Sequence, residues 1–298
     1  MRRARTVSIP LWRASRRKLT AFRTVAQRRS EARATTDELL EHVTRLHTRE
    51  AVHPERGLAA RTRALWSMER IGYAFARKAR RLESLRDRRV SRATSPILHV
   101  GMGVCAAEFG ELDPELTARI IEKLARPEDA DFAYESFGAV FGVNERATQR
   151  WLIGLKPLPR APLRELLPRF EPARQRLMAH GYGRLLYFQH ATLAAAVEAA
   201  RDTALDRGAA VQGIGFAYAM VNHAELTTAL TTALADPADN EHFQTGLVYA
   251  LMFWGWLFAG TLDDERHAPD DPLTTRAREA LARAHAQGRL PAFALPGS

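Results

Sequence analysis

The sequence predicts an all-α protein, in which a single globular helical domain follows a basic helical arm at the N-terminus. One observation predicts the helical class, and a second predicts a folded core. Almost every periodic segment has apolar residues three or four positions apart, which places them on one face of an α-helix. Hydrophobic residues make up 46 % of the 298 residues, enough for a core and too many for wholesale disorder. A third observation, the uneven charge, separates the arm from the domain.

The arm is predicted to span residues 1–50, and the globular domain residues 51–298. Up to Thr94 the chain has 25 Lys and Arg against 9 Asp and Glu, whereas the remainder has 19 against 25. No acidic residue precedes Glu31. An acid-free, arginine-rich start is typical of an organelle transit peptide, and also of a basic arm on a bacterial protein. Only 4 of the 44 cations are lysines, which favours genome composition over phosphate recognition as the cause of the arginine excess.

Helices are predicted along most of the chain. Leu19–Val25 has helical spacing, and Thr35 with Glu38 forms a capping box before the stripe Leu39, Val43 and Leu46. One long helix is predicted from Leu58 to Arg86, and another begins at Asp113 with Pro114 in its first turn. Further helices are expected at 191–204, 225–235 and 274–285, with a Pro-rich connector near 156–168 and a frayed tail from Gly288.

The stretch "ILHVGMGVCAA", Ile97–Ala107, has the Gly-x-Gly spacing of a dinucleotide-binding turn. That site needs a strand before the glycines and a second strand ending in Asp or Glu, yet the residues that follow have helical period. Gly-x-Gly recurs at Gly181 and at Gly213, beside apolar residues each time. The sequence therefore favours close packing of helices over a nucleotide site. It also gives a faint repeat, in which Glu135 and Gly138 correspond to Gln212 and Gly215.

Other motifs point more weakly to chemistry. A nucleophile elbow has a glycine two residues after the nucleophile, but Ala107 stands at that distance from Cys105. A buried structural cysteine is therefore favoured. The ten histidines form no metal-binding motif, and no metal or other cofactor is predicted. The acidic stretch from Asp263 to Asp271 is interrupted by prolines, which favours a solvated loop over a magnesium site. The run "LVYALMFWGWLFAG", Leu247–Gly260, is short for a membrane span and is predicted to be a buried helix, with membrane contact as the alternative.

Four stretches occur in an order that resembles a known family. They are "HVGMGVCAAEFG", "FAYESFG", "ARQRLMAHGYGRLLYF" and "VQGIGFAYA", between Ile97 and Ala219. Together they resemble a bacterial family of unknown function whose genes lie beside those for enediyne polyketide biosynthesis. The family has aspartate where Glu135 stands, and "GYGFH" where this chain has "SFGAVF". The resemblance implies a soluble helical protein of specialised metabolism, and it transfers no catalytic residue.

Three functional hypotheses follow. The first is an accessory or modifying protein that binds a hydrophobic small molecule among aromatic and glycine-bearing helices. The second is an acid–base enzyme, such as a cyclase or isomerase acting on a polyene or isoprenoid-like substrate, with Glu135 as general acid. The third is a polyanion- or membrane-surface-binding protein. The candidate ligand-binding residues are His99, Tyr182, His190, Gln212, Tyr218, Asn222 and His223.

The partners and location predicted from the sequence follow from the basic arm. Its charge should attract phosphate polymers or anionic lipid headgroups, so a cytoplasmic protein that associates peripherally with membranes is one expectation. Docking onto the acidic body of the same chain, or onto an acidic protein partner, is the alternative. The face around Leu19 to Val25 has no side chains suited to reading bases, so sequence-specific nucleic-acid binding is not expected.

Overall fold

A computed structural model describes residues 17–18, 34–77, 83–144, 165, 167–201, 205–264 and 270–293. Within these residues the regular elements are all helical and no strand occurs, which confirms the all-α class. The α-helices are α2 (Thr36–Val52), α3 (Gly57–Ala76), α4 (Ser95–Phe109), α5 (Pro114–Leu124), α6 (Ala130–Asn144), α9 (Pro172–Gln189), α10 (Leu193–Arg201), α11 (Arg207–Val221), α12 (Leu226–Leu230), α13 (Pro237–Leu257) and α14 (Pro272–Gln287). Short 3₁₀ turns at Pro54–Arg56 (η1), Pro127–Asp129 (η3), Leu167–Arg169 (η4) and His223–Glu225 (η5) lie between them.

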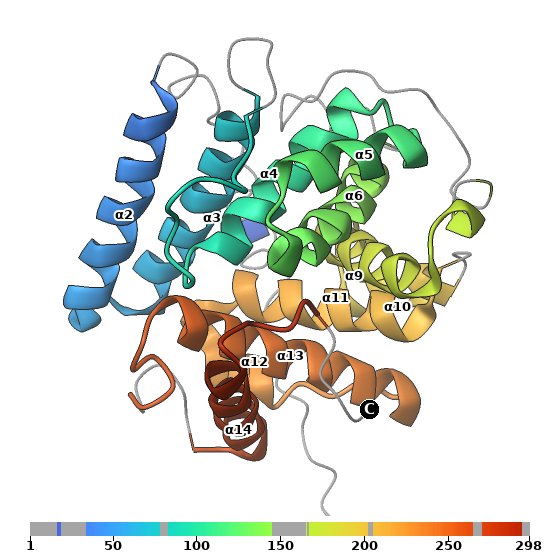
Figure 1. Cartoon of the computed structure of the whole chain (residues 1–298). Coiled ribbons are helices and arrows are strands. Elements are labelled where there is room, and N and C mark those ends of the chain that lie inside the picture. Colours follow the sequence, from blue (N-terminus) through green and yellow to red (C-terminus); the bar gives the residue numbers. More distant parts are fainter. Residues whose placement is uncertain are drawn as a thin grey trace, which may run out of the picture.

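Six of these helices surround a common centre. In Figure 1 the chain passes from α3 through α4, α6 and α9 to α11 and α13, each helix lying against the next. The indole N–H of Trp254 on α13 donates a hydrogen bond to the Thr62 hydroxyl on α3, at 3.1 Å. This bond links α13, the last of these six helices, to α3, the first. We call this arrangement the six-helix ring.

Glycines allow the helices of the ring to approach one another closely. A Cβ added at Gly101 would overlap the carbonyl oxygen of Glu69 on α3, and one added at Gly103 would overlap that of Ala133 on α6. The two glycines of this Gly-x-Gly therefore contact the preceding and the following helix. The same relation recurs on α9 and α11, at Gly181, Gly183, Gly213 and Gly215. The prediction that these glycines pack helices is confirmed, and residues 97–100, where a dinucleotide site would need a strand, are helical.

The N-terminal half confirms some predictions and corrects one. Thr35 and Glu38 form the predicted capping box, and α2, which includes the end of the predicted arm, buries Leu39 and Val43 beside α3 (Figure 1). The single long helix predicted to reach Arg86 is wrong, because α3 ends at Ala76 and 83–94 has no α-helix. The apolar spacing continued past the end of α3 because Leu85 is a core residue, although it lies outside any helix. Residues 19–25 and most of the 156–168 connector lie outside the described residues.

The C-terminal half forms the rest of the core. Leu247–Leu257 is the buried end of α13, as predicted, and among the described residues no helix could cross a membrane. Helix α14 begins at the N-cap Asp271 and ends at Gly288, whose φ of 66° suits glycine. The predicted fraying from Gly288 is wrong for residues up to 293. Leu290 and Phe293 are buried, because the chain turns back into the centre of the ring.

Candidate functional site in the centre of the six-helix ring

The faint sequence repeat marks the residues that face the centre of the ring. We call a glycine that contacts the backbone of a neighbouring ring helix a crossing glycine. On five ring helices a residue stands three positions before such a glycine, which places it one turn away on the same face. These residues are Glu69, Val100, Glu135, His180 and Gln212. They belong to α3, α4, α6, α9 and α11. Glu69 and Val100 line one cavity, Gln212 lines a second, and Glu135 contacts His180. Packing at the glycines thus brings polar groups from separate helices together.

Glu135, His180 and Arg184 form a buried polar cluster. The Glu135 Oε1 atom accepts a hydrogen bond from His180 Nδ1 at 3.0 Å. Arg184 pairs with the same carboxylate through two nitrogens, with Nε 2.6 Å from Oε1 and Nη2 2.7 Å from Oε2. The carboxylate is fully buried and the imidazole is 2 % exposed. An ion pair with one hydrogen bond, from Nη2 to Oε2, offsets part of the cost of burying the charges.

The cluster leaves one nitrogen of the imidazole for other chemistry. Burial lowers the pKa of His180 below its usual 6.5, although the carboxylate of Glu135 acts in the opposite direction. Because Nδ1 donates to Glu135, the neutral ring carries its lone pair on Nε2. Nε2 is buried and has no hydrogen-bond partner among the described residues. The site therefore offers an acceptor, or a base, in water-poor surroundings.

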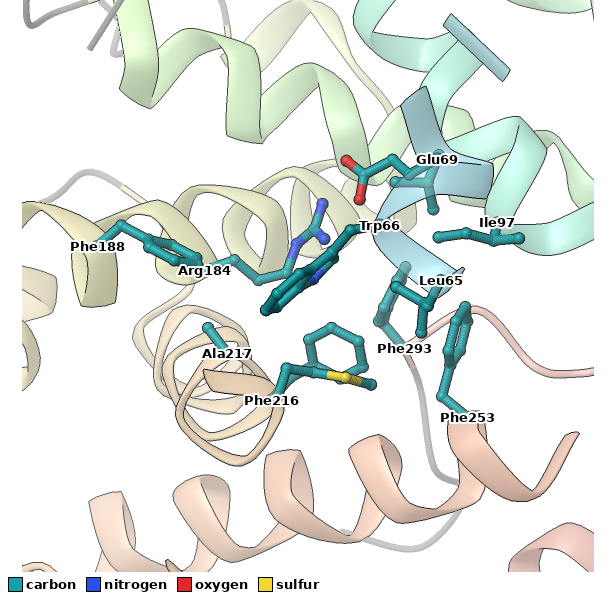
Figure 2. Close-up of a pocket in the computed structure, with 12 residues that line it drawn as sticks. Leu65, Trp66, Glu69, Ile97, Arg184, Phe188, Phe216, Ala217, Phe253 and Phe293 are labelled. Carbon is teal, nitrogen blue, oxygen red and sulfur yellow. The ribbon is translucent and has the colours of Figure 1, made fainter. Parts of the chain in front are cut away.

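Two cavities adjoin this cluster. Figure 2 shows the first, of about 40 Å³, with the Arg184 and Glu69 side chains reaching into one end of it above the indole of Trp66. Its lining is otherwise apolar: Leu65, Trp66, Ile97, Val100, Phe188, Phe216, Ala217, Met220, Phe253 and Phe293. The second, of about 180 Å³, opens to the surface, where Asp131, Ala173 and Arg176 are exposed. Leu177, Ala209, Gln212, Ala292 and Phe293 form the rest of its lining. Phe293 belongs to both linings and lies between the two spaces.

The other predicted site residues fall in different places. His99 is buried in α4, where Nδ1 donates to the Ser95 carbonyl at 2.8 Å and Nε2 accepts from the Arg126 amide at 3.0 Å. Burial lowers its pKa, and both nitrogens serve the packing of α4 against η3. Tyr182 packs beside Gly142, away from the residues that line the two cavities. Of the predicted set, Glu135 and Gln212 are the two that reach the central site.

The remaining four predicted residues lie around the C-terminal end of α11. Asn222 donates to the Tyr187 hydroxyl at 2.9 Å, and the Tyr218 hydroxyl pairs with Thr232 at 3.1 Å. His223 bonds the Met220 carbonyl at 3.0 Å, and burial lowers its pKa. The backbone carbonyl of His190 accepts from Lys18. This cluster is therefore the place where Lys18 of the arm meets the domain.

Two residues of the basic arm dock at this second cluster. Arg17 reaches Asn222 at 3.2 Å and Glu225 at 2.7 Å. Lys18 donates to the His190 carbonyl at 2.8 Å and lies 3.8 Å from the centre of the Tyr187 ring. Burial lowers the pKa of Lys18 to about 8. At these two residues the arm therefore docks onto its own chain, as one of the hypotheses for the arm expected.

Sequence reasoning missed His180, Arg184 and Phe293. His180 stands directly before Gly181, as Gln212 stands before Gly213, so extending the repeat by one helix would have identified it. Arg184 lies one helical turn beyond His180. Phe293 had no sequence signal, because its burial depends on where the chain after α14 turns.

The fold and site define a helical protein with a buried polar cluster and a small aromatic-lined cavity inside a ring of helices, next to a second cavity that opens to the surface. Within the described ranges, no three His, Cys, Asp or Glu side chains lie close enough together to hold a metal ion. Comparison of the chain with protein-family models, with curated proteins and with solved structures gave no match.

Proposed function

We propose that the protein binds a hydrophobic small molecule in the centre of the six-helix ring. The observation that carries this proposal is the unpartnered Nε2 of His180, in a cluster whose Arg184 lines the first, aromatic-lined cavity. Ligand sites are commonly apolar, with a few placed polar groups that fix orientation. Here Arg184 and Glu69 line the first cavity, Gln212 lines the second, and His180 lies against Phe293, which belongs to both linings. The ligand would be mostly apolar and would carry a hydroxyl or N–H donor for Nε2.

The biological setting remains part of the proposal. The ordered motifs between Ile97 and Ala219 resemble a family associated with enediyne polyketide genes. That resemblance supports an accessory or modifying role in natural-product biosynthesis. A conjugated polyketide-like ligand would suit an aromatic lining, since aromatic side chains stack on planar groups.

An acid–base enzyme is the second candidate, favoured by the contact between Glu135 and His180. A carboxylate that holds Nδ1–H leaves Nε2 as a base, as in other catalytic dyads. In this arrangement His180 is the group that would take the proton. Glu135 would position it, because both carboxylate oxygens already face donors of His180 and Arg184. This differs from the role of general acid proposed for Glu135 on sequence grounds.

Binding can be tested with the uncharged fluorescent probe N-phenyl-1-naphthylamine and the full-length protein. Ala217 lines the first cavity, so Ala217→Leu would fill it. We expect this variant to weaken probe binding at least about tenfold, the effect of losing roughly 1.4 kcal/mol. Ala195→Leu, on the exposed face of α10, is the matched control and should bind as wild type does. Equal affinity of all three proteins would place the probe elsewhere and refute the proposed site.

A further inference from the structure

We infer that the C-terminal segment Leu290–Phe293 is a built-in occupant of the central site, and that the Phe293 ring holds the place of a planar aromatic or conjugated group of the ligand. Ligand binding then requires this ring to leave. The inference rests on the proposed function and goes beyond it, because it names the part of the ligand that the site recognises and the segment that blocks it.

The contacts of Phe293 are those that a planar ligand group would find. Its ring stacks on the imidazole of His180, with centroids 4.1 Å apart and an interplanar angle of 30°. It lies 4.9 Å from the Tyr249 ring, and meets Phe132 and Phe216 edge-on at 5.5 and 5.8 Å. These four side chains come from α9, α13, α6 and α11. They form an aromatic box around the Phe293 ring, and one of its walls, the His180 imidazole, carries the unpartnered Nε2.

The segment is attached in a way that allows it to leave. It follows the last helix and has no helical hydrogen bonds of its own. The Tyr249 hydroxyl donates to the Pro291 carbonyl at 2.7 Å. Phe293 itself has a φ of 49°, in the left-handed region that disfavours L side chains. Release of the segment would relieve that conformation without unwinding a helix.

The small volume of the first cavity also indicates that, with Phe293 in place, the centre of the ring is closed to a ligand of the proposed kind. The cavities of about 40 and 180 Å³ would hold a water molecule or two and a small ring, respectively. Pockets for larger ligands measure roughly 300 Å³ or more. Because Phe293 lines both cavities, its departure would join them and uncover the His180 ring. The joined space, with the volume that the phenyl ring vacates, approaches that lower limit.

Probe titration of full-length variants tests the inference. Phe293→Ala should bind N-phenyl-1-naphthylamine at least about tenfold more tightly than wild type, because no ring competes for the box. The control is Phe258→Ala, which removes a buried ring that stacks on His47, away from both cavities. It should leave the affinity unchanged. Unchanged affinity in folded Phe293→Ala would overturn the inference.

A milder variant decides the matter if Phe293→Ala does not fold. Tyr249→Phe keeps the ring but removes the hydroxyl that holds Pro291, so it should raise the affinity about two- to fivefold. Its control is Tyr218→Phe, which removes a hydroxyl bonded to Thr232 outside the box. If neither Phe293→Ala nor Tyr249→Phe binds more tightly while Ala217→Leu still weakens binding, the proposed site is supported and the built-in occupant is wrong. If neither wild type nor any variant binds the probe, both proposals fail.

Discussion

His180 and Phe293 lie face to face in the centre of the protein, although 112 positions separate them in the sequence. The imidazole is held at one edge by Glu135 and covered on one face by the phenyl ring. A ring so enclosed has little access to water, and water is what stabilises the charged form of histidine. The protonation of this side chain is therefore tied to the integrity of the fold.

The first prediction concerns the dependence of stability on pH. Burial lowers the pKa of His180 below 6.5, so in acid the unfolded chain binds a proton that the folded chain does not. The free energy of unfolding should therefore fall as the pH drops below about 6.5, by at most about 1.4 kcal/mol per pH unit for this group. Urea midpoints measured on both sides of that pH would show the fall.

A variant separates His180 from the other titrating groups. His180→Gln cannot titrate but keeps a donor for Glu135, so its stability should depend less on pH. His285→Gln, at an exposed position on α14, should keep the wild-type dependence. Burial lowers the pKa of His99 in the same direction, whereas Asp129 beside it has a pKa raised by burial and acts oppositely. An unchanged slope in His180→Gln would contradict the assignment.

The second prediction concerns the pair of Glu135 and Arg184. Glu135→Gln leaves the guanidinium without its carboxylate, and removal of one partner of a buried pair typically costs about 3–5 kcal/mol. We expect about 3 kcal/mol, because the Arg184 side chain is 14 % exposed. Replacing both residues, as in Glu135→Leu with Arg184→Met, should recover part of the loss. Chemical denaturation measures each variant, with the exposed Glu241→Gln as control. A loss below about 1 kcal/mol would show that the pair contributes little.

The third prediction concerns the crossing glycines. A Cβ at Gly183 would overlap the backbone carbonyl of Ala210, which cannot move without shifting α11. Gly183→Ala should therefore destabilise the protein by about 2 kcal/mol, even though alanine favours an isolated helix by roughly 1 kcal/mol. At Gly142 the added Cβ would meet side chains at 3.3 Å, so Gly142→Ala should cost less. Thermal unfolding of both variants compares them, and a stabilised Gly183→Ala would refute close packing there.

The fourth prediction concerns the basic arm. We expect weak, sequence-independent binding to heparin or DNA that falls steeply as salt rises from about 50 to about 200 mM. Residues 1–16 contain five arginines, so their removal should reduce this binding while Arg17 and Lys18 remain on the domain. Anionic vesicles in place of DNA would distinguish membrane recruitment. The arm has only a structural role if the full chain binds none of these at low salt.

Much of the fold followed from the sequence alone. Periodicity predicted helices, and the capping residues Thr35 and Asp113, recognised in the sequence, fix where two of them begin. Gly-x-Gly in helical surroundings indicated close packing. These features are local: a cap or an amphipathic face is determined by residues within a few positions of one another.

The composition of the site required the tertiary structure. Glu135 and Gln212 could be identified as polar residues in apolar segments, but His99, with the same appearance, serves helix packing. The difference lies in which side chains other helices bring to each polar atom, and no periodicity records this. The end of the chain is the clearest case. Leu290 and Phe293 follow a helix-ending glycine and suggest a loose tail, yet both are buried. A hydroxyl on α13 bonds Pro291 between them, and an imidazole on α9 stacks on Phe293. Their burial depends on contacts far apart in sequence, which exist only once the ring has formed.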